Sequence, residues 1–186
     1  MSRVESLCFR SRPRAITSHY GGLRSYAELQ ATTNFSFLRG ASHADELIAT
    51  AKALGLSAIA VTDRNSLAGV VRAHTAAKEL VMRFIVGVRL DLEDAPSLLC
   101  YPTDRAAYGR LCRLLSLGQG RSAKGHCAIR LADVATHAEG QIFIVLPPRQ
   151  PAAEFSERLA TLSAAARDRV YLGATFAYRG DERRRL

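Results

Sequence analysis

Short apolar runs alternate along this chain with longer segments of helical periodicity, and this alternation restricts the possible fold more than any other feature. The runs at residues 57–62, 84–90 and 141–146 each lie beside a segment whose apolar residues recur at three- or four-residue spacing. Such alternation is typical of βα units, which build a mostly parallel sheet or a barrel. We therefore expect an α/β fold that begins near Tyr26.

The same pattern predicts the individual elements. Strands are expected at residues 26–33, 57–62, 84–90, 97–101, 141–146 and 170–173. Helices are expected at residues 42–55, 67–81, 103–116, 131–138 and 152–167. The hydroxyls of Ser42 and Thr103 can cap two of these helices, and Gly55 and Gly118 are expected to end them. The residues assigned to the apolar faces of the first two helices include Leu54, Val71 and Val81.

The charge of the chain is uneven. The formal net charge is +9, and residues 1–25 supply a large part of it with five Arg against one Glu. That segment has no periodicity, which favours a basic flexible leader followed by a folded domain over residues 26–186.

Several protein classes are excluded by composition. No apolar run approaches the roughly 20 residues that a membrane-spanning helix needs, and residues 1–25 lack the continuous apolar stretch of a secretory signal. The four cysteines show no Cys-x-x-Cys spacing, which argues against a zinc knuckle or a disulfide framework. We therefore expect a cytoplasmic protein with no membrane contact.

Two stretches are specific enough to indicate a family. Residues 26–43 read YAELQATTNFSFLRGASH, and residues 60–74 read AVTDRNSLAGVVRAH. They closely resemble the amino-terminal polymerase-and-histidinol-phosphatase (PHP) domain of bacterial C-family DNA polymerases, in particular the error-prone, damage-tolerant branch of proteobacteria. The resemblance extends over most of residues 26–180 and implies a PHP-type distorted β/α barrel. It also implies that the barrel is incomplete at its C-terminal end and that the chain is truncated.

The resemblance further implies where metal ions would bind, at the strand ends of members that hydrolyse phosphoesters. Those members carry His-x-His where this chain has Gln30 and Thr32. They carry Thr-Asp-His where this chain has Thr-Asp-Arg, so that Asp63 is kept and Arg64 replaces the histidine. A metal-bridging Glu is replaced by Arg89. Neutral amide and hydroxyl groups are poor ligands, and guanidinium groups bring permanent positive charge. We therefore expect these five positions to be a vacated metal site, with no cofactor and no catalytic residue.

Two arrangements of the replacement arginines remain open. In one, Arg64 and Arg89 occupy the emptied site and pair with Asp63 and other carboxylates, so that fixed charge replaces an exchangeable cation. In the other, both side chains point to solvent from a loop and a strand end.

The resemblance implies a non-catalytic module of an error-prone polymerase that serves damage-induced mutagenesis and translesion synthesis. Its partners would be the polymerase body and, through the full-length enzyme, DNA, the sliding clamp and accessory mutagenesis proteins. The palm carboxylates that nucleotidyl transfer requires have no room in 186 residues. One alternative is a small nucleic-acid-binding protein, supported by the Arg-rich leader at residues 1–25, Arg110, Arg113 and residues 121–124. Another is a metal-dependent phosphoesterase or exonuclease, which the replaced ligands oppose.

Overall fold

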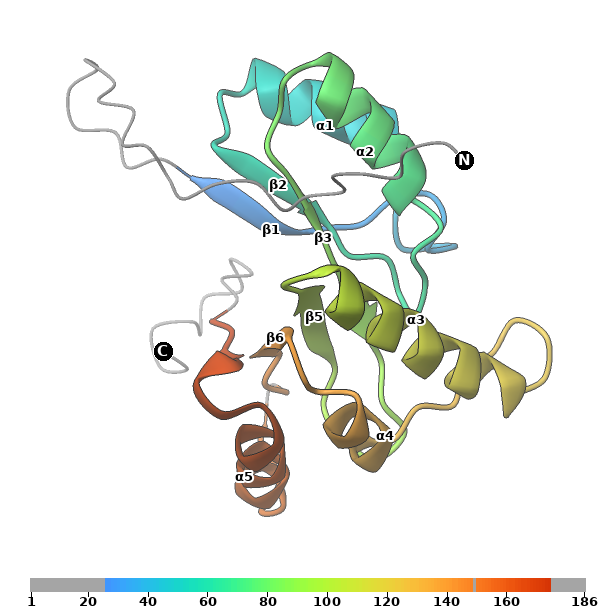
Figure 1. Cartoon of the computed structure of the whole chain (residues 1–186), viewed down its shortest axis with the longest axis vertical. Coiled ribbons are helices and arrows are strands. Elements are labelled where there is room, and N and C mark those ends of the chain that lie inside the picture. Colours follow the sequence, from blue (N-terminus) through green and yellow to red (C-terminus); the bar gives the residue numbers. More distant parts are fainter. Residues whose placement is uncertain (1–25, 149, 175–186) are drawn as a thin grey trace. The chain divides into compact units, whose positions relative to one another are not determined.

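The computed structural model of the protein describes residues 26–148 and 150–174, and the chain divides into two compact units after Gly87 (Figure 1). The elements of unit 1, in chain order, are β1 (Ala27–Ala31), α1 (Ala44–Ala53), β2 (Ala58–Val61), α2 (Val70–Glu79) and β3 (Phe84–Val86). Its three strands form a parallel sheet in the order β1-β2-β3. The two helices pack against each other and against the sheet. Unit 1 is thus built from two consecutive βα units, as the alternation predicts.

The core of unit 1 is formed by an entirely buried central strand and by small residues on the helices. Every residue of β2 is buried, and α2 buries Val70, Ala73, Ala76 and Ala77. Small side chains allow close approach between packed elements. This packing corrects one expectation, because Leu54, Val71 and Val81 are 70%, 74% and 83% exposed. A short helix buries one stripe, and on α2 the alanines occupy it.

Unit 2 combines a mixed sheet with three α-helices. Its elements are β4 (Val88–Leu90), β5 (Leu98–Pro102), α3 (Arg105–Gly120), α4 (Leu131–Thr136), β6 (Gln141–Val145), α5 (Phe155–Ala166), the 3-10 turn η1 (Arg167–Arg169) and β7 (Val170–Leu172). The sheet order is β4-β5-β6-β7. The first two pairings are antiparallel and only β6–β7 is parallel, so this sheet departs from the mostly parallel expectation. The apolar core includes Leu90, Leu98, Leu111 and Phe143, each fully buried.

The single strand expected at residues 84–90 is two strands in the structure. β3 pairs with β2 in one sheet, and β4 pairs with β5 in the other, with Gly87 between them. An apolar run carries no information about its pairing partner, because both sheets bury the same kind of side chain. The expected strand is therefore wrong in extent, although both halves are β-structure.

Two helix caps lie one residue later than expected. His43 and not Ser42 precedes α1, and the backbone N–H of His43 donates to Glu46 Oε2 at 2.8 Å. Asp104 caps α3 by accepting from the N–H of Ala107 at 2.7 Å. The expected cap, Thr103, instead donates its hydroxyl to the carbonyl of Gly140 at 2.7 Å.

Gly118 does not end α3, which continues to Gly120. A Cβ at Gly118 would lie 2.5 Å from Ile129 Cγ1 and 2.7 Å from Cys127 Sγ. The glycine is thus required by close packing of the segment that returns along the helix, and not by a helix end.

In the part of the chain that the structure describes, no helix has the length and apolar character needed to cross a bilayer.

Candidate functional site

The carboxyl ends of β1 and β2 are neighbours, because the two strands are parallel, and Asp63 lies there. Its side chain is almost fully buried, with 1% exposure. Asp63 Oδ1 accepts hydrogen bonds from the Thr33 N–H at 2.9 Å and the Ser36 hydroxyl at 2.8 Å. Asp63 Oδ2 accepts from the Thr33 hydroxyl at 2.8 Å. Three uncharged donors from the turn after β1 therefore hold this carboxylate.

Two further contacts enclose the carboxylate. The Ser36 hydroxyl accepts from the backbone N–H of Arg64 at 3.0 Å, which links the turn after β1 to the turn after β2. A Cβ at Gly69, just before α2, would lie 2.6 Å from Asp63 Oδ2 and 3.1 Å from the Thr33 hydroxyl. The carboxylate is packed on that side with no space for an added atom.

The other predicted positions of unit 1 lie near this cluster in the chain. Gln30 is a half-buried residue of β1, and its backbone N–H donates to Glu28 Oε1 at 2.7 Å. Thr32 follows β1, and its carbonyl lies against Gly40, where a Cβ would come within 2.6 Å of it. The side chain of Arg64 is half-buried. The sequence pattern does not identify Thr33 and Ser36, which bind Asp63 in the structure.

Arg89 lies in unit 2, on β4, and takes part in a separate polar cluster. Its Nε donates to Asp91 Oδ1 at 3.0 Å, and one terminal nitrogen donates to the Ser97 hydroxyl at 3.2 Å. The Ser97 hydroxyl donates to the same Asp91 oxygen at 2.6 Å. The Arg89 and Asp91 side chains are 25% and 29% exposed. Arg89 therefore has a carboxylate partner within its own unit.

These residues do not fit a divalent metal cluster. Within residues 26–148 and 150–174, no three His, Cys, Asp or Glu side chains come together closely enough to hold a metal ion. Both oxygens of Asp63 already accept hydrogen bonds from the protein. An amide, a hydroxyl and two guanidinium groups at the remaining positions are not the ligands that divalent cations prefer.

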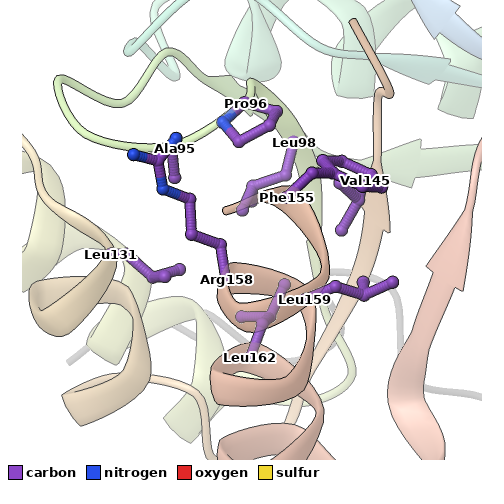
Figure 2. Close-up of a pocket in the computed structure, with 9 residues that line it drawn as sticks. All are labelled: Ala95, Pro96, Leu98, Leu131, Val145, Phe155, Arg158, Leu159 and Leu162. Carbon is purple, nitrogen blue, oxygen red and sulfur yellow. The ribbon is translucent and has the colours of Figure 1, made fainter. Parts of the chain in front are cut away.

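Unit 2 also contains a narrow apolar cleft between α5 and the sheet. Figure 2 shows Phe155, Leu159 and Leu162 of α5 beside Leu98 and Val145 of the sheet. The volume of this cleft is about 10 Å³, which is room for one water molecule at most. This cleft is a small packing gap between α5 and the sheet, and it has no space for a substrate.

Two of the described cysteines, Cys100 and Cys127, lie in surroundings that disfavour the thiolate. Cys100 is completely buried, and its thiol donates to Gln141 Oε1 at 3.3 Å. Burial raises the pKa of the Cys100 thiol far above its ordinary value, and burial also raises the pKa of Cys127. Because the thiolate is the reactive form, neither thiol is primed for attack at neutral pH.

Comparison with known proteins identifies the family. Residues 28–172 match the model of the PHP domain. The chain belongs to the PHP domain family. The matched segment spans most of the chain and includes elements of both units.

Curated relatives of this PHP chain are error-prone DNA polymerases. It is 57% identical over 162 residues to the error-prone DNA polymerase of Caulobacter vibrioides and 51% identical over 162 residues to error-prone DNA polymerase 2 of Agrobacterium fabrum. Each alignment covers 87% of this chain and 15% of the relative. The chain thus spans about 15% of the length of these relatives.

Solved structures share the fold. An amidohydrolase from Chromobacterium violaceum superposes with a TM-score of 0.62 at 16% identity, over 79% of this chain and 76% of that one. A protein assigned as a metal-dependent phosphoesterase from Bifidobacterium adolescentis gives 0.55 at 13% identity, over 81% and 87%. At sequence identities this low, the comparison shows only that the fold is shared. The predicted PHP-type α/β fold is confirmed.

Proposed function

We propose that this chain is a non-catalytic PHP module of an error-prone DNA polymerase, formed by residues 26–186. The high identity to such polymerases supports the context. The main support for a non-catalytic role is the hydrogen bonding of the Asp63 carboxylate. Three donors of the chain occupy both oxygens of the one carboxylate among the five predicted metal positions.

In this proposal hydrogen bonds perform the structural task that metal ions perform in metal-binding PHP domains. Asp63 connects the end of β2 to the turn that follows β1 through Thr33 and Ser36. A hydrogen bond to a charged group contributes about 1.5 to 3 kcal/mol, so three of them offset a large part of the cost of burying the carboxylate. Gln30, Thr32, Arg64 and Arg89 are then vacated positions, which have no ligand to supply.

Nucleotidyl transfer, translesion synthesis and the role in damage-induced mutagenesis are assigned in this proposal to the remainder of the polymerase. The direct protein partner of the module is that polymerase body, and the sliding clamp and accessory mutagenesis proteins are reached through it. DNA is the substrate of the full-length enzyme. The proposed location is the cytoplasm.

A metal-binding experiment tests the non-catalytic role. We expect the purified chain to retain no stoichiometric zinc or manganese and its Tm to stay constant when either metal is added. The matched variant introduces ligands at the predicted positions of unit 1, with Gln30→His, Thr32→His and Arg64→His, and is compared with the unsubstituted chain in the same titrations. A metal-dependent rise in Tm of the unsubstituted chain, together with hydrolysis of a phosphomonoester that Asp63→Asn abolishes, would contradict the proposal.

A binding experiment tests the partner. We expect the chain to co-purify with a separately expressed polymerase that lacks the segment matched by this chain. The absence of a complex at micromolar concentration would count against the polymerase body as partner.

A further inference from the structure

The most uneven charge distribution in the described residues lies in unit 2, over α3 and the segment that follows it. Residues 105–130 contain six Arg and Lys and no Asp or Glu. The segment comprises α3, an exposed loop at residues 121–126 and the approach to α4. In Figure 1 the loop extends beyond the C-terminal end of α3. A run of cations this long without a carboxylate favours an anionic partner.

Three of the six cations are already neutralised within unit 2. Arg110 pairs with Glu139 at 3.5 Å. Arg121 pairs with Asp133 at 2.7 Å. Arg130 pairs with Glu93 at 3.2 Å. Two cations that the sequence favoured for nucleic-acid contact, Arg110 and Arg121, therefore serve internal contacts.

The other three cations have no such partner among the described residues. Arg105, Arg113 and Lys124 are exposed, and no carboxylate of the described residues lies within ion-pair distance of them. Arg105 and Arg113 are eight positions apart on α3, which corresponds to a rise of about 12 Å. Lys124 lies in the loop beyond the end of the same helix. These charges thus lie along α3 and on the loop that follows it.

The surface between these cations is unobstructed. One side of α3 carries Arg113 together with three small residues at three- or four-residue spacing, Gly109, Ser116 and Gly120. Ser116 and Gly120 are exposed, and Gly120 has no heavy atom within 4 Å of the position where a Cβ would be. The Nε of Arg113 donates to the carbonyl of Gly109 at 3.3 Å, which directs its side chain along the helix. Small residues between cations allow a polymer backbone to approach the helix closely.

We propose that α3 and the loop at residues 121–126 form a DNA-backbone-binding face, with Arg105, Arg113 and Lys124 as its phosphate contacts. The choice of DNA over another polyanion rests on the proposed function. Contacts of this kind are independent of sequence, because phosphates carry no base information. The only Phe, Tyr or Trp in residues 105–130 is the half-buried Tyr108, so this segment offers no exposed aromatic side chain for base stacking.

The test compares two triple variants of the full chain that lose the same charge. One neutralises the proposed contacts, with Arg105→Gln, Arg113→Gln and Lys124→Gln. The control neutralises three exposed cations of unit 1, with Arg39→Gln, Lys78→Gln and Arg83→Gln. Binding to a fluorescein-labelled DNA duplex of mixed sequence is measured by anisotropy over a series of salt concentrations, and circular dichroism checks the fold of each variant.

We expect the unsubstituted chain to bind the duplex weakly and with a steep salt dependence. Removing three phosphate contacts should lower the slope of log K against log salt by about 3 and weaken binding at least about tenfold, whereas the control should keep the slope. Absence of binding by the unsubstituted chain would overturn the proposal. An unchanged slope in the first variant, or an equal loss in the control, would do the same.

Failure of this proposal is distinguishable from failure of the proposed function. If the chain forms a complex with the polymerase body but binds no duplex, only the DNA-binding face is lost. If it binds the duplex but forms no complex, the polymerase-module assignment is lost instead.

Discussion

The two units stabilise a carboxylate in opposite ways. In unit 1, Asp63 is 1% exposed and is held by uncharged donors from Thr33 and Ser36. In unit 2, Asp91 is 29% exposed and pairs with the guanidinium of Arg89. A buried carboxylate is tolerated only when several donors replace its water shell, whereas a partly exposed ion pair contributes little because solvent screens it. We therefore expect the Asp63 cluster to contribute more to the stability of the protein than the Arg89–Asp91 pair.

Replacement of Asp63 by Ala should have the largest effect. The Thr33 N–H and the hydroxyls of Thr33 and Ser36 would lose their acceptor inside the protein, and each unsatisfied buried group costs about 1 to 3 kcal/mol. We expect a loss of about 4 kcal/mol in the free energy of unfolding, measured by urea denaturation. Asp91→Ala is the matched control and should cost about 1 kcal/mol or less. Equal losses in the two variants would remove the distinction between the clusters.

The sequence predicts where Asp63 lies but not what binds it. Its position after the apolar run at residues 57–62 identifies a strand end, because the run is short and a polar loop follows it. Thr33 and Ser36 reach Asp63 through the course of a turn about thirty residues earlier in the chain. Hydroxyl residues in a turn carry no sequence signal for a partner so far away.

The same limit applies to the fold. Helical and strand periodicity predicts the presence and type of every described α-helix and β-strand outside residues 84–90, although it does not predict the 3-10 turn η1. There the apolar pattern is continuous although the strands on either side of Gly87 pair in different sheets. Likewise, Gly118 is required by its contact with Ile129, which is a tertiary property, and sequence position alone favours a helix end. Local pattern therefore predicts elements, while pairing and close packing depend on the rest of the chain.

A substitution at Gly69 perturbs the Asp63 cluster without removing a hydrogen-bonding group. The backbone of Gly69 has φ −75° and ψ −15°, which Ala adopts without strain. Its Cβ would nevertheless lie 2.6 Å from Oδ2 of the Asp63 carboxylate, which three hydrogen bonds to its two oxygens hold in place. We expect Gly69→Ala to destabilise the protein by about 2 kcal/mol, measured by urea denaturation.

Gly109→Ala is the control for that substitution. Gly109 lies inside α3, and the nearest atom to its Cβ position is a terminal nitrogen of Arg113 at 3.9 Å. Because Ala is about 1 kcal/mol better than Gly in a helix interior, this variant should be more stable than the unsubstituted chain. If both variants shifted stability in the same direction, crowding at Asp63 could not be the cause of the Gly69 effect.

The stability cost of removing the Arg89–Asp91 pair should depend on salt, whereas the cost of removing Asp63 should not. Replacing Arg89 by Met keeps the aliphatic stem and removes the pair with Asp91, at an expected cost of about 0.5 to 1 kcal/mol at low ionic strength. The cost should fall toward zero near 1 M NaCl, where the Debye length is about 3 Å. The cost of Asp63→Ala should not change with salt, because its donors are uncharged and buried. Urea titrations at both ionic strengths measure this, and a salt-independent cost at Arg89 would show that the ion pair is not the source of its contribution.

The smallest expected effect concerns Asp133, which stands between the two extremes because it is largely buried and pairs with an arginine. Burial alone would raise the pKa of the Asp133 carboxyl, but hydrogen bonds from the Arg130 N–H at 3.0 Å and the Arg121 guanidinium at 2.7 Å outweigh burial and hold the pKa below its ordinary value. A carboxyl with a lowered folded-state pKa contributes stability above its unfolded pKa of about 3.9, and this contribution is lost as the pH falls through the folded pKa. Asp133→Asn should therefore cost about 0.5 kcal/mol at pH 7, and the difference between variant and unsubstituted chain should shrink as urea titrations are repeated at decreasing pH below about 4. If the stability difference between the two proteins stayed constant through that range, Asp133 would contribute through its hydrogen bond to the start of α4 and not through its charge.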